Sequence, residues 1–237
     1  MNCVMVGFED CRRHYKHPEK VVVTGTPVRG DFFALTKQQA REKLGYTDDK
    51  PLVASFWGSL GASTMNARML DFFRREQADG FPFHHIHATG RYGVELLPRL
   101  LREKGVAYEN NPNLDIREYI HDMPDCLAAA DLVIARAGAI TLAELTAVGR
   151  ASVLIPSPNV AENHQYHNAM VLANHKAAVV IEEKDLTGEK LVAAVKEMTA
   201  DPEKLREIGL AAKALGVPNA CGHITDELLD LYKTHRK

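Results

Sequence analysis

The chain has 237 residues, of which 46% are hydrophobic and 25% are charged, so it is long enough to bury a substantial core. Its 29 basic and 31 acidic side chains give a formal net charge of -2, which excludes the nucleic-acid-binding classes that need a strongly basic surface. No run reaches the roughly 18 consecutive apolar residues of a membrane span. The composition predicts a globular protein with no nucleic-acid partner and no transmembrane segment.

Apolar runs alternate with helical patterns along the chain, as is typical of β-α units and a parallel sheet. The predicted strands are Val4–Phe8, Val21–Thr24, Leu52–Phe56, His84–Ala88, Val106–Tyr108, Asp115–Tyr119, Leu132–Ala135, Ser152–Ile155 and Ala178–Ile181. The predicted helices are Thr36–Leu44, Ala62–Ala78, Val94–Lys104, Met123–Ala130, Thr141–Val148, Asn163–Asn174, Glu189–Thr199, Glu203–Ala214 and His223–Lys233. This order predicts an α/β fold with a Rossmann-like, doubly wound parallel sheet.

Two places interrupt the alternation. The turn Gly25-Thr26-Pro27 directly follows a predicted strand and indicates a domain junction. After Pro202 only helical patterns remain, with a break at Gly216-Val217-Pro218-Asn219, which predicts a C-terminal helical cap.

The stretch ARAGAITLAELTAVGR, residues 135–150, runs from a predicted strand through small residues into a helix. Ligands of open α/β sheets bind beyond the carboxyl ends of strands, and a helix N-terminus beside small residues favours an anionic group. Thr141 and Glu144 also match a capping box, in which the Thr side chain takes the N3 amide and the Glu reaches back. Two interpretations stay open here, an anion site and a plain helix cap.

A second small-residue loop, SFWGSLGAS at residues 55–63, also leads from a predicted strand into a helix. The hydroxyl of Ser59 can donate to a phosphate from such a loop, although an ordinary tight turn has the same composition. The loop has neither the Gly-Lys-Ser/Thr of a Walker motif nor the G-x-G-x-x-G pattern. A mononucleotide diphosphate held without those fingerprints is compatible with both loops.

The third stretch, PSPNVAENHQYHNAMVLANH at residues 156–175, follows a predicted strand and enters a helix that carries Gln165. An amide both donates and accepts hydrogen bonds. Gln165 is therefore suited to sugar hydroxyls.

Metal binding is not predicted. His164 and His167 lie three residues apart on the predicted helix, but no third ligand has a recognisable position. The same holds for His85 and His87 on one face of a predicted strand. No D-x-D pair, which could hold a divalent cation on a diphosphate, occurs in the chain.

With these stretches, the sequence resembles the MurG family of GT-B glycosyltransferases, which transfer N-acetylglucosamine from UDP-GlcNAc to lipid I in bacterial peptidoglycan biosynthesis. The matching segments are GTPVR (25–29), FWGSLGA (56–62), YIHDM (119–123), ARAGAITLAEL (135–145) and NHQYHNA (163–169). They occur in the family's order and with similar spacing. Five ordered matches are far more specific than any one of them.

The resemblance implies an inverting, metal-independent hexosyltransferase without a cofactor, whose C-terminal Rossmann-like domain binds the UDP-sugar donor. Carried over position by position, it implies that Arg29 and Ser59 meet the diphosphate. It also implies that Ala139, Ile140 and Thr141 lie at the helix turn that faces the pyrophosphate.

For the rest of the donor, the resemblance implies that the backbone of Ile120 binds uracil and that Glu144 holds the ribose hydroxyls. Gln165 is implied to bind the hydroxyls of GlcNAc. His164 is the one departure, because many members have Gln at this position.

The resemblance also divides the chain. Residues 1–26 look like the last strand and helix of an N-terminal acceptor domain, residues 27–218 like the UDP-GlcNAc-binding domain, and residues 219–237 like a helix that returns to the acceptor domain. The family's glycine-rich acceptor loop, with its candidates for the catalytic base, has no counterpart in the sequence. We therefore expect no catalytic residue in this chain, and we expect lipid I to be bound through a missing domain or a partner chain.

The function expected from the resemblance is that of a MurG-type polypeptide that is mainly a donor-binding half and is inactive alone. It would act in the cytoplasm, or peripherally at the cytoplasmic face of the membrane. The alternatives are a stand-alone UDP-GlcNAc-binding module and the donor subunit of a split, two-chain GlcNAc-transferase. Because the acceptor domain is expected to be missing, the apolar face of residues 223–237 is expected to lie exposed.

Overall fold

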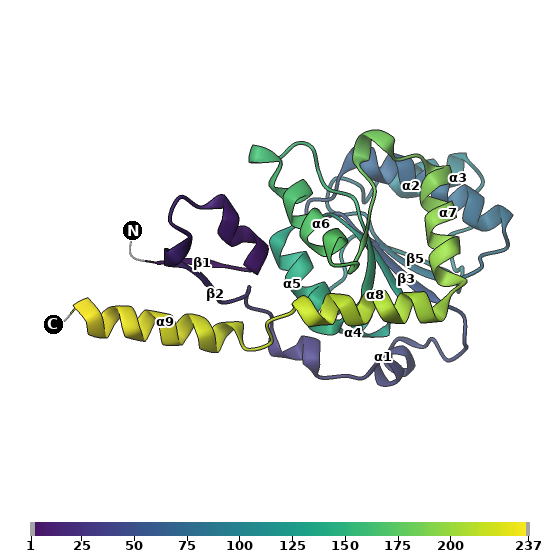
Figure 1. Ribbon diagram of the computed structural model, residues 1–237. Helices are drawn as coiled ribbons and strands as arrows, with labels where there is room; N and C mark the ends of the chain where they lie inside the picture. Colours follow the sequence, from purple (N-terminus) through teal and green to yellow (C-terminus); the bar gives the residue numbers. More distant parts are fainter. Residues whose placement is uncertain (1–2, 236–237) are drawn as a thin grey trace.

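The main sheet of the protein has six parallel strands in the order β5-β4-β3-β6-β7-β8, as seen in a computed structural model that describes residues 3–235 (Figure 1). The strands are β3 (Leu52–Phe56), β4 (His84–Ala88), β5 (Leu114–Arg117), β6 (Leu132–Ala135), β7 (Ala151–Leu154) and β8 (Val179–Val180). Counted from β3, this is the 3-2-1-4-5-6 order of dinucleotide-binding folds. The predicted Rossmann-like sheet is therefore confirmed.

Helices cover both faces of this sheet (Figure 1). They are α1 (Lys37–Leu44), α2 (Ser63–Ala78), α3 (Leu96–Glu103), α4 (Met123–Ala129), α5 (Ala139–Val148), α6 (His164–Asn174), α7 (Gly188–Thr199) and α8 (Pro202–Leu215). A further helix, α9 (Ala220–His235), lies away from this sheet. One hydrophobic cluster lies under α1, α4, α5 and α6, and a second under α2, α3 and α7. Among residues 3–235, no helix is long and apolar enough to cross a membrane.

Burial on both faces explains why the central strands read as continuous apolar runs. All residues of β3 and β6 are buried. Along β3 the side chains alternate between the two clusters, with Ala54 and Phe56 in the first and Val53 in the second.

The predicted strand at residues 106–108 is wrong. Val106 is buried, as its apolar character suggested, but it packs into the core from a loop. The Tyr108 N–H donates to the Val106 carbonyl oxygen at 3.1 Å, so the chain turns instead of extending. The outermost strand on this side of the sheet is therefore β5.

A second, two-stranded parallel sheet stands beside the main one. In it β1 (Val4–Val6) pairs with β2 (Val21–Val23), and the short helices η1 (Glu9–His14) and η2 (Pro18–Lys20) lie between them in the chain. Figure 1 shows α9 extending next to this small sheet and away from the main one. Residues 1–2 and 236–237, at the ends of the predicted first and last segments, lie outside the described residues.

Two chain segments, one through Gly25 and one through Val217, connect the small sheet and α9 to the main domain, and they lie against each other. Gly25 has a φ of +77°, and a Cβ there would lie 2.5 Å from the Cβ of Val217, so only glycine lets the segments approach this closely. On α9 the side chains of Leu228, Leu229 and Tyr232 are about half exposed, 56%, 49% and 56%.

The loops after β3 and β4 touch through their backbones. A Cβ on Gly61 would lie 2.2 Å from the Thr89 carbonyl oxygen, and one on Gly90 would lie 2.2 Å from the Gly61 nitrogen. The N–H groups of residues 91–92 donate to the carbonyl oxygens of residues 59–60, at 3.3 and 3.0 Å. The two loops therefore form one unit that accepts only glycine at its contact.

Helix α1 begins with a capping box. The Gln39 N–H donates to Thr36 Oγ1 at 3.3 Å, and the Thr36 N–H donates to Gln39 Oε1 at 3.0 Å. Two backbone donors at this helix start are therefore satisfied by side chains.

The capping box predicted at Thr141 and Glu144 is wrong. Helix α5 begins at Ala139, with Gly138 as its N-cap in an extended conformation and with no side-chain cap. Because the small, helix-favouring Ala139 lets the helix start two residues before Thr141, Glu144 falls in the second turn, where it cannot reach back. The plain-cap interpretation of this stretch is removed.

These two helix starts can be compared by mutation. Thr36→Ala should lower the free energy of unfolding by about 1 kcal/mol, because a real cap is lost. Thr141→Ala should leave it unchanged or raise it slightly, since Ala favours the helix interior and no cap depends on the hydroxyl. Urea unfolding followed by circular dichroism measures both values, and equal losses would contradict the structural difference.

The loop contact gives a second matched pair. Gly58 and Gly61 both have positive φ, +82° and +74°, but a Cβ on Gly58 would meet nothing within 4 Å. Gly58→Ala should therefore cost only the left-handed conformation, about 1–2 kcal/mol. Gly61→Ala should cost a further 1–3 kcal/mol or so, because the methyl group also displaces the Thr89 backbone. The same loss of unfolding free energy in both variants would show that the loops separate freely.

Candidate functional site

The candidate site lies where β3 and β6 end side by side. These strands are paired with Phe56 opposite Ala135, and each is followed by one of the two small-residue loops. Strand order reverses at this point of the sheet, because β4 follows on one side and β7 on the other. In open α/β sheets, this switch point is where ligands bind.

The N-terminus of α5 is accessible at this end of the sheet, beyond the carboxyl ends of β3 and β6. Ala139 is exposed, Ile140 is 65% exposed, and Thr141 is half-buried. Since no side chain caps the helix, its first-turn N–H groups and its dipole are directed at the switch point. An anion placed there would be stabilised by both.

The charge of Arg29 acts on the carboxyl group of Glu144, a residue of α5. Arg29 precedes the short helix η3 (Gly30–Phe33), which packs against α5. Its guanidinium lies 5.5 Å from the centre of the Phe32 ring, and its Nε lies 3.5 Å from Asp31 Oδ1. Burial raises the pKa of Glu144, while Arg29 lowers it and Asp31 raises it. Arg29 and Glu144 are thus electrostatic neighbours.

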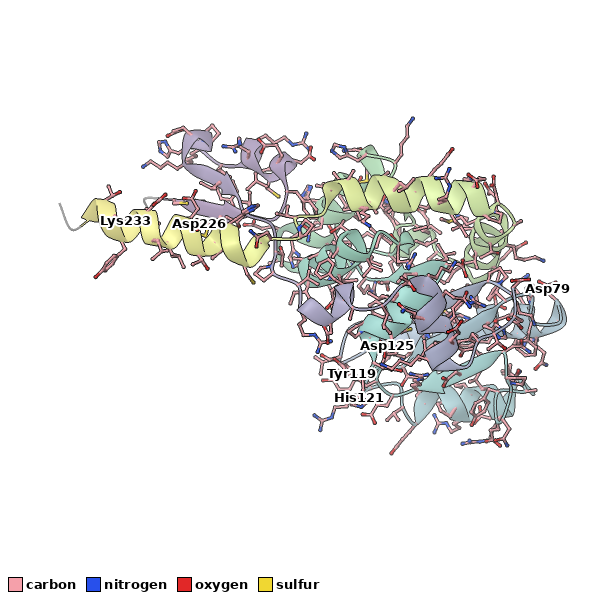
Figure 2. All side chains as sticks on the ribbon, turned by 90° about the horizontal axis from the view of Figure 1, so that it is seen from below. Asp79, Tyr119, His121, Asp125, Asp226 and Lys233 are labelled. Atoms are coloured by element: carbon pink, nitrogen blue, oxygen red, sulfur yellow. The ribbon has the colours of Figure 1, made fainter. Side chains whose placement is uncertain are left out.

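Ser59 lies in the loop after β3, and Ile120 lies in the segment after β5, with β4 between these two strands. Ser59 is exposed in the loop after β3. Ile120, after β5, buries its side chain in the core at 1% exposure, so its backbone is the part left to meet a ligand. It is flanked by Tyr119 and His121, whose ring centres are 5.0 Å apart and which Figure 2 labels.

The loop before α6 is strained and orients Gln165. Glu162 and Asn163 both have a φ of +51°, which is uncommon for residues other than glycine and is often found at functional sites. His164 then opens α6 and is exposed. The Ser157 N–H donates to Gln165 Oε1 at 2.9 Å, which fixes the amide.

Arg136 was not singled out in the sequence. It directly follows β6, is only 9% exposed, and donates from Nη1 to the Ile155 carbonyl oxygen at 3.1 Å. Its Nη2 lies 2.6 Å from Oε2 of Glu183, in the short helix η5 (Glu183–Asp185) after β8. The hydrogen bond and the ion pair together join the segments after β6, β7 and β8. The signal available was an arginine between a buried strand and a glycine.

The histidine pairs noted in the sequence lack a third ligand. Among residues 3–235, no group of three or more His, Cys, Asp or Glu side chains is placed to hold a metal ion. His85 and His87 are fully buried, and a ring nitrogen of each lies 2.7 Å from Ser55 Oγ.

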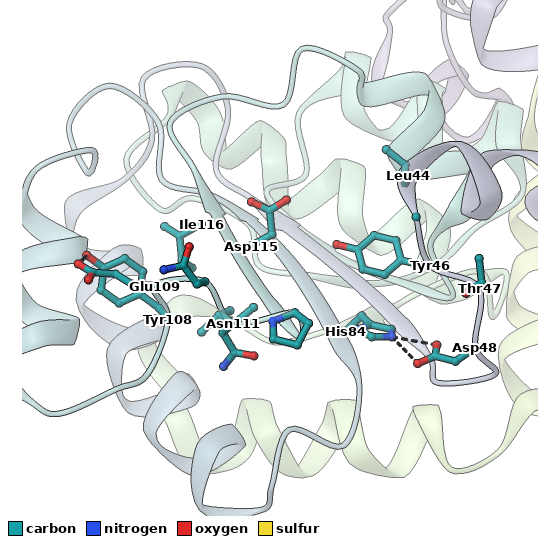
Figure 3. A pocket seen from close by; sticks show the side chains of 14 residues that line it. Leu44, Tyr46, Thr47, Asp48, His84, Tyr108, Glu109, Asn111, Asp115 and Ile116 are labelled. Carbon is teal, nitrogen blue, oxygen red and sulfur yellow. Dashed lines mark hydrogen bonds and ion pairs between the residues drawn. The ribbon is translucent and has the colours of Figure 1, made fainter.

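A cavity of about 680 Å³ opens at the other end of the sheet (Figure 3). Tyr46, Asp48, His84 and Asp115 contribute to its lining, and His84 Nε2 lies 2.9 Å from both carboxylate oxygens of Asp48. His84 is the first residue of β4, so this cavity lies at the amino ends of the strands. None of the site residues predicted from the sequence lines this cavity.

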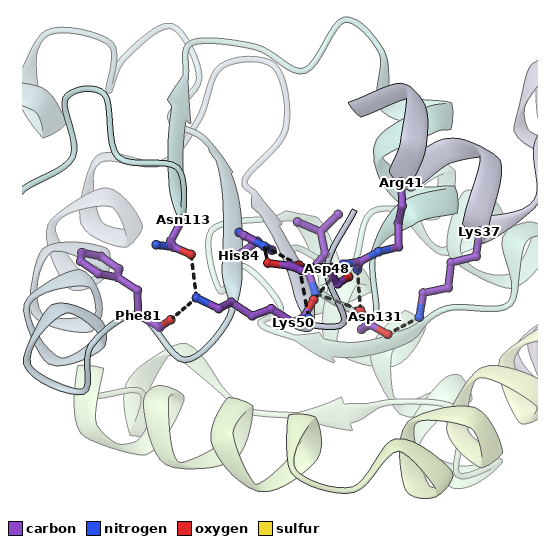
Figure 4. A network of polar contacts seen from close by, with 9 residues as sticks. Lys37, Arg41, Asp48, Lys50, Phe81, His84, Asn113 and Asp131 are labelled. Atoms are coloured by element: carbon purple, nitrogen blue, oxygen red, sulfur yellow. Dashed lines mark hydrogen bonds and ion pairs between the residues drawn. The ribbon is translucent and has the colours of Figure 1, made fainter. Parts of the chain in front are cut away.

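The polar contacts around Asp131 also belong to the amino ends of the strands (Figure 4). Asp131 pairs with Lys37 and Arg41 of α1 and accepts from the Leu52 N–H at 2.9 Å. These contacts hold α1 to the start of β3, at the end of the sheet opposite the switch point.

Residues 53–223 match the family model of the glycosyltransferase family 28 C-terminal domain. The UDP-N-acetylglucosamine–N-acetylmuramyl-(pentapeptide) pyrophosphoryl-undecaprenol N-acetylglucosamine transferase of Acetivibrio thermocellus is 39% identical over 230 residues, 97% of this chain and 61% of that protein. The protein of the same name from Bacillus subtilis is 36% identical, over 98% of this chain and 62% of its own length. The chain thus spans less than two thirds of these relatives.

Solved structures agree with this assignment. The crystal structure of Acinetobacter baumannii MurG is similar with a TM-score of 0.69 and 28% identity, over 90% of this chain and 58% of that one. The S. aureus MnaA-UDP co-structure shares the fold at 12% identity and a TM-score of 0.65. The predicted resemblance is confirmed: the chain belongs to the family defined by the glycosyltransferase family 28 C-terminal domain.

Proposed function

We propose that this chain is the donor-binding half of a MurG-type N-acetylglucosaminyltransferase of peptidoglycan biosynthesis, and that its switch-point site binds UDP-GlcNAc. The observation that carries the proposal is the uncapped N-terminus of α5 with Arg29, Glu144 and the Ser59 loop around it. The relatives named above, which are described as GlcNAc transferases, support the choice of donor.

The diphosphate would lie at the start of α5. The backbone N–H groups of Ala139, Ile140 and Thr141 would meet its oxygens, and the helix dipole would favour its negative charge. Ser59 would donate its hydroxyl from the facing loop, and Arg29 would neutralise charge from the side of η3. This arrangement needs no divalent cation, because amides and a guanidinium take its role.

The two ends of the donor would lie on either side. The Ile120 backbone would bind uracil, and the Glu144 carboxylate would accept from the ribose hydroxyls. Gln165, already oriented by its bond to Ser157, would bind the GlcNAc hydroxyls with His164 beside it.

In the transfer step, a hydroxyl of lipid I would attack the anomeric carbon from the face opposite UDP. The bond between the anomeric carbon and the phosphate oxygen would break, and the configuration at that carbon would invert. The α5 dipole and Arg29 would stabilise the negative charge that develops on the leaving UDP. The base that takes the hydroxyl proton would belong to the acceptor side, outside this chain. We place the reaction at the cytoplasmic face of the membrane, where this half would act as a peripheral partner of the acceptor-binding part.

Donor specificity tests the proposal directly. The chain should bind UDP-GlcNAc roughly 3- to 10-fold more tightly than UDP-glucose, since one additional hydrogen bond at the sugar contributes about 0.5–1.5 kcal/mol. Binding should persist in EDTA. Isothermal titration calorimetry measures both; no heat with either nucleotide in a folded sample would remove the donor site, and loss of binding on chelation would contradict its metal independence.

The role of Glu144 can be tested by pH. Burial raises the pKa of Glu144 above its ordinary value of 4.5, so the carboxylate that accepts from the ribose is lost as the pH falls through that raised value. UDP-GlcNAc affinity should therefore weaken on acidification. Glu144→Gln should bind about tenfold or more weakly at pH 7, with unchanged melting and without this pH response.

A second variant serves as the control for this measurement. His164 opens the same helix beside Gln165, and His164→Gln replaces its imidazole with an uncharged polar side chain. Glu144 is responsible if the acid-weakened binding survives in His164→Gln and disappears in Glu144→Gln. Wild-type affinity in Glu144→Gln would show that the ribose is held elsewhere.

A further inference from the structure

A chain of buried polar side chains runs beneath the loops that follow β3 and β4. Its members lie on the α2 side of the sheet and are at most 1% exposed: Ser55, Asn66, Glu76, His85 and His87. Apolar rings surround it, and Phe72 and Phe73 lie 5.3 and 5.1 Å from the His85 ring, centre to centre. Polar groups placed this deep must satisfy one another.

Each member lies within hydrogen-bonding distance of the next. Glu76 Oε2 is 3.0 Å from His85 Nδ1, and His85 Nε2 is 2.7 Å from Ser55 Oγ. Ser55 Oγ is also 2.7 Å from His87 Nδ1, and His87 Nε2 is 3.4 Å from Asn66 Oδ1. The chain ends where Asn66 Nδ2 donates to the Thr89 carbonyl oxygen at 2.8 Å. That oxygen is the atom against which Gly61 packs.

The last bond fixes the direction of the others. A carbonyl oxygen only accepts, so Asn66 must present Nδ2 to Thr89 and therefore Oδ1 to His87. His87 must then donate from Nε2. Full burial lowers the pKa of His87 far below its ordinary value and that of His85 to about 3, so both rings are neutral. With Nε2 protonated, His87 Nδ1 accepts from the Ser55 hydroxyl.

The same reasoning reaches Glu76. Because the Ser55 proton points to His87, Ser55 Oγ accepts from His85 Nε2, and His85 Nδ1 is left as an acceptor. Glu76 must therefore donate, as a neutral carboxylic acid. Burial raises the pKa of Glu76 well above its ordinary value, in agreement. Within residues 3–235 its Oε1 has no hydrogen-bond partner, a condition that a neutral carbonyl tolerates better than a carboxylate.

We infer that Asn66 is a positioning residue for the diphosphate-binding loop, and that the one-directional hydrogen-bond chain from Glu76 to Thr89 holds it in place. The importance of this loop for binding rests on the proposed function. A Cβ on Gly93 would lie 2.0 Å from Asn66 Nδ2, so the Asn66 amide is also confined from its other side. Through Thr89 and Gly61, this hydrogen-bond chain fixes the position of Ser59 relative to α5.

The proton positions can be measured without any nucleotide. Long-range ¹H–¹⁵N NMR spectra of the histidine rings should show His85 and His87 both as neutral tautomers with the proton on Nε2. A proton on Nδ1 of either ring would overturn the chain's direction. Glu76→Gln should leave both tautomers unchanged, because the Gln amide also donates to His85 Nδ1.

Asn66→Leu tests the positioning role. Leu has a similar size but can neither donate to Thr89 nor accept from His87, so UDP affinity should fall by about tenfold or more and the amide resonances of Ser59 and Gly61 should shift. Glu76→Gln is the matched control, with affinity within about twofold of the wild type because the Gln amide still donates to His85. Wild-type affinity and unshifted loop resonances in folded Asn66→Leu would overturn the inference.

Two further arms keep the outcomes distinct. If Asn66→Leu does not fold, Ser55→Ala removes a single oxygen in the middle of the hydrogen-bond chain and should give the same loop shifts. If the wild-type protein binds no UDP, the proposed function fails, while the tautomers and the Ser59 and Gly61 resonances still decide whether Asn66 positions the loop.

Discussion

The proposed donor site depends above all on the parallel pairing of β3 with β6. Their register, with Phe56 opposite Ala135, makes both strands end at the same level of the sheet. The helices that follow them pack on opposite faces, α2 over one hydrophobic cluster and α5 over the other. The two connecting loops therefore diverge at the switch point, and the N-terminus of α5 faces the space between them.

Buried polar contacts on both sides of this pairing hold the two loops. On the β6 side the Arg136–Glu183 ion pair lies under the loop that leads to α5. On the β3 side the hydrogen-bond chain that ends at Asn66 lies under the Ser59 loop. Buried polar groups add little net stability but lose much when a partner is removed, so they favour one fixed arrangement over many. Such rigidity suits a site built largely from backbone N–H groups, which cannot adjust as side chains do.

The sequence predicted the parallel sheet because its signals are local: apolar runs for strands, and small residues between a strand and a helix. The site residues carried over from the family resemblance stay predictions. The sequence failed where the outcome depends on distant contacts. Val106 looked like part of a strand because it is buried, although it reaches the core from a loop. The start of α5 was misplaced because Thr141 and Glu144 imitate a capping box. Asn66 gave no signal, since its partners His87 and Thr89 lie 21 and 23 residues away in sequence. The domain boundaries near residues 26 and 218 stay predictions.

The central claim, that UDP-GlcNAc binds at the carboxyl ends of β3 and β6, is tested most directly by mapping backbone amide chemical shifts during a titration with UDP-GlcNAc. The account predicts that the largest changes cluster at residues 58–61, at Ile120 and at residues 138–141, with smaller ones near Gln165. Changes centred on Tyr46, His84 and Asp115, at the cavity beside the amino ends of the strands, would contradict it.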